Sequence, residues 1–320
     1  MEQNNESNFD KAFAIAWNEN QGSYSQNLAK KVLKFIKLQD LKVETVLDVC
    51  CGSANFLNEM ALNGKECTGT EILDSYVEYN KSKFPNMKFY KTADIDNLEG
   101  LGTYDLITCN HDVVNMLPSL DGWGKFFRNV YTHLNNGGLF IFDYYTKRKL
   151  KDWNETFFDG NEKIDYIKNV VCDGVAKTSI SNIYYINLVN KSKDDFVSAF
   201  DRAYDMNDYE SKYKKAEDTM EEYYFDNQDI LARIKQAGYR YLITTDGNLS
   251  PISMIDDVNR MHIIAIKHEW QSKKEPQNRD SFIIINFIIK NKNTSKRSVF
   301  CLYLTLFAVL TSPKNTGCGL

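Results

Sequence analysis

Two periods of apolar residues alternate along the first 145 residues of the chain. Short runs rich in β-branched and aromatic residues are separated by stretches in which apolar residues recur every three or four positions. The runs predict strands covered on both faces, and the stretches predict helices with one buried face. The predicted strands are 44–49, 66–71, 87–91, 104–110 and 138–143, and the predicted helices are 24–37, 54–63, 74–83 and 121–135.

The order of these elements predicts a parallel sheet. Strand and helix alternate with short links, and parallel strands need such crossovers. The alternation resumes after about residue 225, where Asp226 or Asn227 can cap a helix that Gly238 ends, and strands follow at 240–245 and 260–267. We therefore expect an α/β fold with a doubly wound, mostly parallel, seven-stranded Rossmann-like sheet.

The pattern changes between residues 146 and 225. The runs 180–189 and 196–204 are rich in tyrosine and β-branched residues, which indicates strands without intervening helices. We interpret this segment as an antiparallel β insertion. The predicted organisation is then a helical cover (1–40), a core (41–145), the insertion (146–225), a second core segment (226–270) and a tail (271–320) whose structure the sequence does not predict.

The tail contains two apolar runs, 282–289 and 299–310, separated by a charged stretch. Both are shorter than the roughly 20 apolar residues that a membrane helix needs. Membrane insertion is therefore disfavoured, with the cationic Lys296 and Arg297 as its only support. We expect a tail packed on the domain or a poorly ordered extension.

Composition narrows the class of protein. The 320 residues are 43% hydrophobic and 26% charged, which suits one large α/β domain with an insertion. A net charge of −4 argues against a nucleic-acid partner. Seven cysteines without a C-x-x-C pair indicate free thiols in a reducing compartment, and the polar N-terminus does not resemble a secretory signal, so we expect a cytoplasmic protein. The four histidines show no metal-ligand spacing, and no metal is expected.

Candidate chemistry is concentrated after the first predicted strand. Asp48 lies among apolar residues of that strand, where a buried carboxylate is costly without a purpose. The five residues after that strand, 50–54, are small, so a ligand can lie against backbone N–H groups where the next helix begins. Glu71 follows Asp48 by 71 − 48 = 23 residues, close to the spacing of about 20 at which a second-strand acid reaches ribose hydroxyls. The turn is therefore predicted to bind a nucleoside.

The sequence Asp48-Val-Cys50-Cys-Gly52-Ser-Ala54 resembles the first motif of class I S-adenosylmethionine-dependent methyltransferases, commonly D-x-G-x-G-x-G. Cys50 and Ala54 replace two of the three glycines, and either would be strained where the backbone needs a positive φ. Further landmarks of the family follow in order, so that the resemblance covers about 13–267. It implies S-adenosyl-L-methionine as cofactor and an insertion over the active-site edge that shapes the acceptor pocket.

The resemblance also implies roles for single residues. Asp48 would order the turn and orient the methionine amino group, Cys50 would lie at the ligand edge of the sheet, and Gly52 would let the ligand approach the backbone. Glu71 would accept both ribose hydroxyls. The remaining cofactor contacts would come from Asp94 and the Ile95 backbone to adenine, from Asn110 to the methionine amino group, and from Trp17 and Tyr24, which resemble an aromatic segment that folds across the site.

Structural alternatives stay open for these residues. Asp48 could cap the next helix, Glu71 could be a solvated surface acid, and Asp94 could begin a turn. Trp17 and Tyr24 could belong to the core instead of the site.

On the acceptor side, His111 and Asp112 would lie beside the transferred methyl group. Histidine suits proton removal near neutral pH, which makes His111 the catalytic candidate, although a lone histidine is more often structural. Tyr144 and Tyr145 are candidates for the pocket rim, because they follow the fifth strand.

The predicted function is methyl transfer to an amine or hydroxyl of a small polar molecule by direct displacement. One alternative is a catalytically silent protein that binds the nucleoside, since fold and cofactor motif do not establish turnover. A second is an NAD-dependent oxidoreductase, which the missing glycines disfavour. The sequence predicts neither the acceptor nor the oligomeric state.

Overall fold

The computed structural model describes residues 6–160, 164–174, 177–187, 213–252 and 258–267, together with short strands at 283–284 and 307–308. The side chains of 6–21 and of a few strand residues are outside this description. The predicted run 196–204 and most of the tail also lie outside the described residues.

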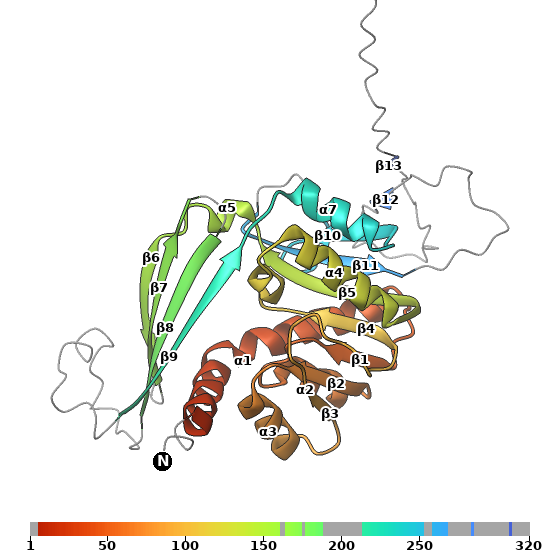
Figure 1. Cartoon of the computed structure of the whole chain (residues 1–320). Helices are drawn as coiled ribbons and strands as arrows, with labels where there is room; N and C mark the ends of the chain where they lie inside the picture. Colours follow the sequence, from red (N-terminus) through yellow and green to blue (C-terminus); the bar gives the residue numbers. More distant parts are fainter. Residues whose placement is uncertain are drawn as a thin grey trace, which may run out of the picture.

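The main sheet has the strand order β13-β12-β10-β11-β5-β4-β1-β2-β3 (Figure 1). Its first five strands along the chain pair in parallel, β11 pairs antiparallel with β5 and β10, and β12 and β13 add two short edge strands. Without that edge pair the sheet has the seven mostly parallel strands that the sequence predicts, so the predicted fold class is confirmed. These strands are β1 (Thr45–Asp48), β2 (Glu66–Glu71), β3 (Lys88–Lys91), β4 (Tyr104–Cys109), β5 (Leu134–Tyr145), β10 (Tyr241–Thr245) and β11 (Arg260–Ile266); the edge pair is β12 (Ile283–Ile284) and β13 (Phe307–Ala308).

Helices cover both faces of this sheet. One face packs on α1 (Glu6–Leu38), α2 (Asn55–Leu62) and α3 (Asp74–Lys83), and the other packs on α4 (Leu120–Thr132) and α7 (Asn227–Gln236). Helix α1 begins well before the predicted residue 24. The apolar stripe that carried the prediction is confined to the later half of the helix, where Leu28, Val32 and Ile36 are buried.

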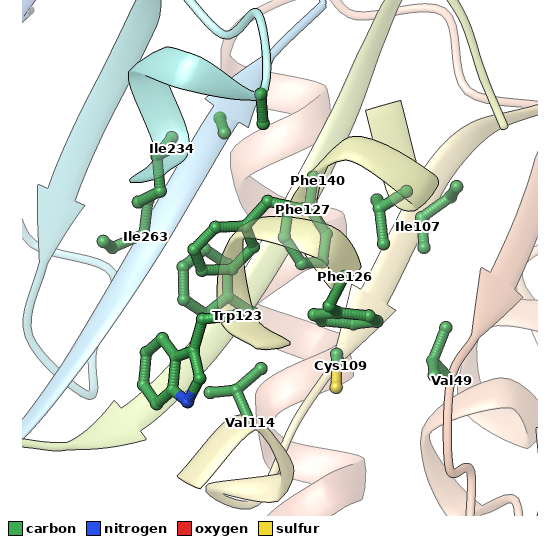
Figure 2. Packing of buried hydrophobic residues seen from close by; sticks show 14 of the residues in the cluster. Val49, Ile107, Cys109, Val114, Trp123, Phe126, Phe127, Phe140, Ile234 and Ile263 are labelled. Atoms are coloured by element: carbon green, nitrogen blue, oxygen red, sulfur yellow. The ribbon is translucent and has the colours of Figure 1, made fainter. Parts of the chain in front are cut away.

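Helix α4 shows how the second face is filled. Ser119 caps the helix by accepting a hydrogen bond from the Gly122 N–H at 3.1 Å. The side chains of Trp123, Phe126 and Phe127 are fully buried at helical spacing (Figure 2). Their rings meet strand β5 and the adjoining part of α7, so this cluster fixes α4 against the sheet.

The predicted insertion forms a separate antiparallel sheet of order β6-β7-β8-β9 beside α1 (Figure 1). Its strands are β6 (Glu155–Gly160), β7 (Ile164–Cys172), β8 (Lys177–Asn187) and β9 (Tyr213–Tyr223), and the predicted run 180–189 falls in β8 up to Asn187. Leu150 ends the short helix α5 (Lys147–Leu150), and Trp153 follows it. Both residues pack on Val170 and Ile180 of this sheet. The short helix η1 (Val113–Met116) contacts β9 and so joins the two sheets.

Candidate functional site

A cavity of about 340 Å³ opens at the carboxyl ends of β1, β2 and β4, the edge at which α/β sheets bind ligands. Gly22 and Ser25 of α1 and Met220 of β9 close its other side. Most of the predicted site residues meet in its wall: Asp48, Cys50, Gly52, Glu71, Ile95, Asn110 and His111.

The turn after β1 adopts a left-handed backbone at alternate residues. The φ angles are +55° at Cys50, +51° at Gly52 and +56° at Ala54. These are the three positions that the family motif usually fills with glycine, so both replacements are in the strained conformation that the sequence indicated as a risk. Asn80, which sequence reasoning missed, holds the turn by donating a hydrogen bond to the Gly52 carbonyl at 2.6 Å.

Glu71 ties the end of β2 to this turn. Its Oε2 accepts a hydrogen bond from the Gly52 N–H at 2.9 Å, and its Oε1 accepts one from the Ile72 N–H at 2.7 Å. The side chain is buried, and burial raises its pKa although these backbone bonds oppose the rise. Oε1 also accepts a longer hydrogen bond from the Leu73 N–H at 3.4 Å, whereas Oε2 keeps a lone pair for a further donor, such as a hydroxyl group.

Asp48 is the second buried acid of the cavity. Its Oδ1 accepts hydrogen bonds from Thr108 Oγ1 at 2.6 Å and from Asn110 Nδ2 at 3.3 Å. Burial raises its pKa to about 7 against the hydrogen bond from Thr108, and the charge of Glu71 adds to the rise. The Oδ1 atom of Asn110 is buried without a hydrogen-bond partner among the described residues. A cationic donor between Asp48 and Asn110 would satisfy both groups.

His111 and Asp112 follow β4 with consecutive left-handed φ angles of +61° and +54°. Such strain is typical of functional sites. The Nε2 atom of His111 lies 2.7 Å from Ser25 Oγ, and its ring centre lies 4.6 Å from that of Tyr24. Burial lowers the pKa of His111, although the charges of Asp143 and Asp112 act in the other direction. The imidazole is therefore neutral at pH 7 and able to accept a proton.

A charged network supports this loop from behind. Asp143 is fully buried and pairs with Arg260, with Nη1 and Oδ2 2.7 Å apart, while Arg260 also pairs with Asp112. Asp143 further accepts hydrogen bonds from the Asp112 N–H at 2.8 Å and from the Tyr24 hydroxyl at 3.3 Å. Burial acts to raise the pKa of Asp143, but the charges of Arg260, His262 and His111 outweigh it and lower that pKa below its usual value.

Sequence reasoning missed Arg260, because an arginine at the start of a strand usually faces solvent. Only the antiparallel pairing of β11 with β5 places Arg260 opposite Tyr145 and His262 opposite Asp143. One signal could have found Arg260. It begins a predicted strand, and the predicted strand 138–143 ends in an acid.

The remaining predicted residues lie elsewhere. Asp94 is exposed and is not part of the cavity wall; its Oδ1 accepts a hydrogen bond from the Ile95 N–H at 2.9 Å. Tyr24 also lies outside the wall and packs on His111 from behind. Trp17 lies in α1, and its side chain is outside the described part of the structure. The prediction of Tyr144 as a rim residue is wrong, because its ring is fully buried in the core among other aromatic rings.

Among the residues that the structure describes, no helix is long and apolar enough to cross a membrane. No group of three or more histidine, cysteine, aspartate or glutamate side chains is placed to hold a metal ion there.

A sheet of this strand order, with its ligand cavity at the strand ends, defines the class I methyltransferase fold. A family model described as a methyltransferase domain matches residues 21–169 of the chain. Two curated relatives carry methyltransferase names, one from Geobacillus sp. and one, YqeM, from Bacillus subtilis. They are 26% and 24% identical over 148 and 127 residues, which cover 44% and 38% of this chain. These matches span 59% and 51% of the relatives, little more than half of their lengths.

Solved structures agree on the fold. An S-adenosylmethionine-dependent methyltransferase from Clostridium acetobutylicum has a TM-score of 0.64 at 19% identity and covers 80% of this chain and 98% of its own. CalS10, an amino pentose methyltransferase from Micromonospora echinaspora, has a TM-score of 0.57 at 15% identity and covers 76% and 91%. DesVI from Streptomyces venezuelae has a TM-score of 0.58 at 13% identity and covers 79% and 94%. The predicted class I methyltransferase fold is thereby confirmed, and residues 21–169 are similar to a methyltransferase domain.

Proposed function

We propose that this protein is a methyltransferase that binds S-adenosyl-L-methionine and methylates an amine or hydroxyl group of a small polar molecule by direct displacement. The observation that carries the proposal is the meeting of Glu71, the 50–54 turn and Asn110 in one cavity at the strand ends. The residues of this wall offer the groups that such a cofactor requires, including the unpartnered Oδ1 of Asn110.

The residues of the wall divide the cofactor among them. Glu71 accepts the ribose hydroxyls, with Oε2 keeping a lone pair for this role, and Gly52 leaves the backbone open to the ligand. Asp48 and Asn110 hold the methionine amino group, which is a cation and therefore favours the ionised form of Asp48. The backbone of Ile95, in the wall, and the adjoining Asp94, outside it, are assigned to adenine, and Cys50 is assigned to the edge of the turn. Trp17 and Tyr24 belong to the N-terminal helical cover of the site.

When bound, the cofactor supplies an electrophilic methyl group, so the protein mainly has to align a nucleophile and exclude water. His111 lies in the cavity wall in its neutral form and accepts the proton that the acceptor releases. The similarity to CalS10, described as an amino pentose methyltransferase, supports a small polar acceptor. The net charge of −4 disfavours a nucleic-acid partner, and the seven cysteines without a C-x-x-C pair support a cytoplasmic enzyme.

A second candidate function is binding of the cofactor without turnover. The observation that favours it is the left-handed backbone at Cys50 and Ala54, where a glycine would be unstrained. Under this alternative the protein would sense the nucleoside or present it to a partner.

Calorimetric titration with S-adenosylhomocysteine tests the cofactor site. Replacing Glu71 by alanine removes the ribose contact and the hydrogen bond to Gly52, so we expect Glu71→Ala to weaken binding by about tenfold or more. Glu66→Ala on the same strand is the matched control, because Glu66 is exposed and pairs with Lys88 at the surface. Equal affinities of wild type and Glu71→Ala would refute the ribose assignment.

Turnover is tested separately with methyl-labelled S-adenosylmethionine and a metabolite extract. Label found in a small molecule, identified by mass, supports the methyltransferase. Binding of S-adenosylhomocysteine without any label transfer supports the silent binding protein.

A further inference from the structure

Glu222 adds a carboxyl group behind the acceptor side of the cavity wall. It lies on β9 two residues after Met220, and alternate residues of a strand point to the same face. Met220 lines the cavity, whereas Glu222 is only 1% exposed and hydrogen bonds with Asp112 of the cavity wall. The insertion sheet therefore contacts the loop that carries His111 and Asp112.

The charges around this contact do not balance. Arg260 is shared between Asp112 and Asp143, so one cation faces two carboxylates before Glu222 is counted. The cavity wall contains Asp48, Glu71 and Asp112 but neither lysine nor arginine among the described residues. The site is thus suited to a positively charged ligand, and an anionic acceptor would be repelled.

The protonation of Glu222 fits this picture. Burial, followed by the charge and hydrogen bond of Asp112, raises the pKa of Glu222 well above its usual value. Arg260 and Lys168, the cations that face it from β11 and β7, oppose the rise. The raised pKa favours the protonated form of Glu222, which can donate a hydrogen bond to Asp112.

We propose that Asp112 and Glu222 form a carboxyl pair that selects an acceptor with a basic amine, with Asp112 contacting the ammonium group and Glu222 positioning Asp112. This inference rests on the proposed methyl transfer.

In the proposed reaction the acceptor binds as an ammonium ion, and one of its protons passes to the neutral imidazole of His111. The nitrogen lone pair then forms the bond to the methyl carbon while the bond from carbon to sulfur breaks. The sulfur keeps the electron pair and becomes a neutral thioether, and the positive charge remains on the methylated amine.

The first experiment divides the metabolite extract by cation exchange before incubation with methyl-labelled S-adenosylmethionine. We expect the label in molecules of the bound, basic fraction. Label in the neutral or anionic fraction would overturn the amine site while leaving the methyltransferase intact. No label in either fraction, with S-adenosylhomocysteine still bound, would overturn both.

The second experiment compares substitutions at Glu222 with the basic fraction as substrate. Glu222→Gln keeps a donor to Asp112 and should retain the wild-type dependence of rate on acceptor concentration. Glu222→Met has no donor, so the acceptor concentration for half-maximal rate should rise by about tenfold with unchanged affinity for S-adenosylhomocysteine. Glu221→Met is the control, because Glu221 lies on the opposite face and pairs with Lys177.

Equal losses in Glu222→Gln and Glu222→Met would overturn the positioning role. An infrared measurement keeps the test independent of folding of the methionine variant. The difference spectrum of wild type minus Glu222→Gln should contain the carbonyl band of a protonated buried acid. Absence of that band from the difference spectrum would refute the carboxyl pair.

Discussion

Single residues at the cavity adopt backbone conformations that their side chains disfavour. Cys50, Ala54, His111 and Asp112 all have φ between +54° and +61°. A left-handed conformation costs a residue with a Cβ atom roughly 1–2 kcal/mol, and such residues persist only where surrounding contacts hold them. At the 50–54 turn those contacts include the hydrogen bond from Asn80 and the bond from Gly52 to Glu71. The strain and the ligand groups therefore occur in the same few residues.

Replacing Ala54 by glycine tests this strain. Ala54 and Ala29 are both fully buried, but Ala29 lies in helix α1. Both changes to glycine remove a buried methyl group, and only Ala54→Gly relieves a left-handed conformation. Both substitutions should lower the unfolding free energy, measured by urea denaturation. We expect the decrease to be smaller in Ala54→Gly than in Ala29→Gly, by at least about 1 kcal/mol. Equal losses would show that the turn is unstrained.

Between elements, one amide side chain connects the two sheets. Asn115 of η1 is fully buried and donates hydrogen bonds to the carbonyls of Tyr145 and Tyr223, each at 3.0 Å. Its Oδ1 accepts a hydrogen bond from the Tyr145 N–H at 2.9 Å. Tyr145 ends β5 and Tyr223 ends β9, so Asn115 fixes the insertion sheet against the core beside the acceptor side of the cavity.

Asn115→Leu should be strongly destabilising, because it leaves three buried backbone groups without partners. At about 1–3 kcal/mol for each unsatisfied group, we expect a loss of roughly 3 kcal/mol or more in unfolding free energy. Asn63→Leu is the control, because the side chain of Asn63 is exposed and donates a hydrogen bond to the nearby Glu59 carbonyl. A loss below about 1 kcal/mol in Asn115→Leu would contradict this role.

For the whole molecule, the buried acids make stability depend on pH in opposite directions. Burial raises the pKa of Asp48, Glu71 and Glu222, so the folded state binds their protons more tightly than the unfolded chain does. Stability from these groups is present at low pH and falls as the pH rises. Asp143 behaves oppositely, because its pKa is lowered and its contribution is lost only in acid. The protein thus gives up stability near neutral pH in order to keep acids in its cavity.

Asp48→Asn isolates the titration of one of these acids. The pKa of Asp48 is about 7 in the folded protein and 3.8 without the fold, so its contribution declines between these values. We expect the unfolding free energy of Asp48→Asn, relative to wild type at the same pH, to increase by about 2–3 kcal/mol from about pH 5 to about pH 8. Chemical denaturation at both pH values measures this, and the comparison with wild type cancels the other titrating groups. A constant difference would contradict the raised pKa.

Much of the core followed from local pattern. Strands β1, β2 and β4 and helix α3 lie within a residue or two of their predicted bounds, since burial on one or both faces imposes a period on the sequence. The turn after β1 and the acid at the end of β2 were predicted for the same reason, because a ligand edge of a parallel sheet needs small residues and an acid at set distances along the chain.

Contacts between distant segments left no such signal. Glu222 meets Asp112 across 110 positions of the chain (222 − 112), and Arg260 reaches Asp143 only because β11 pairs with β5 in one register. A shift of that register by one residue would turn both side chains to the opposite face. The sequence by itself thus determined the sheet, its helices and the cofactor turn, because these depend on local periodicity. Only the tertiary structure decided which charges face the acceptor, because that depends on strand register and on how the insertion sheet packs against η1.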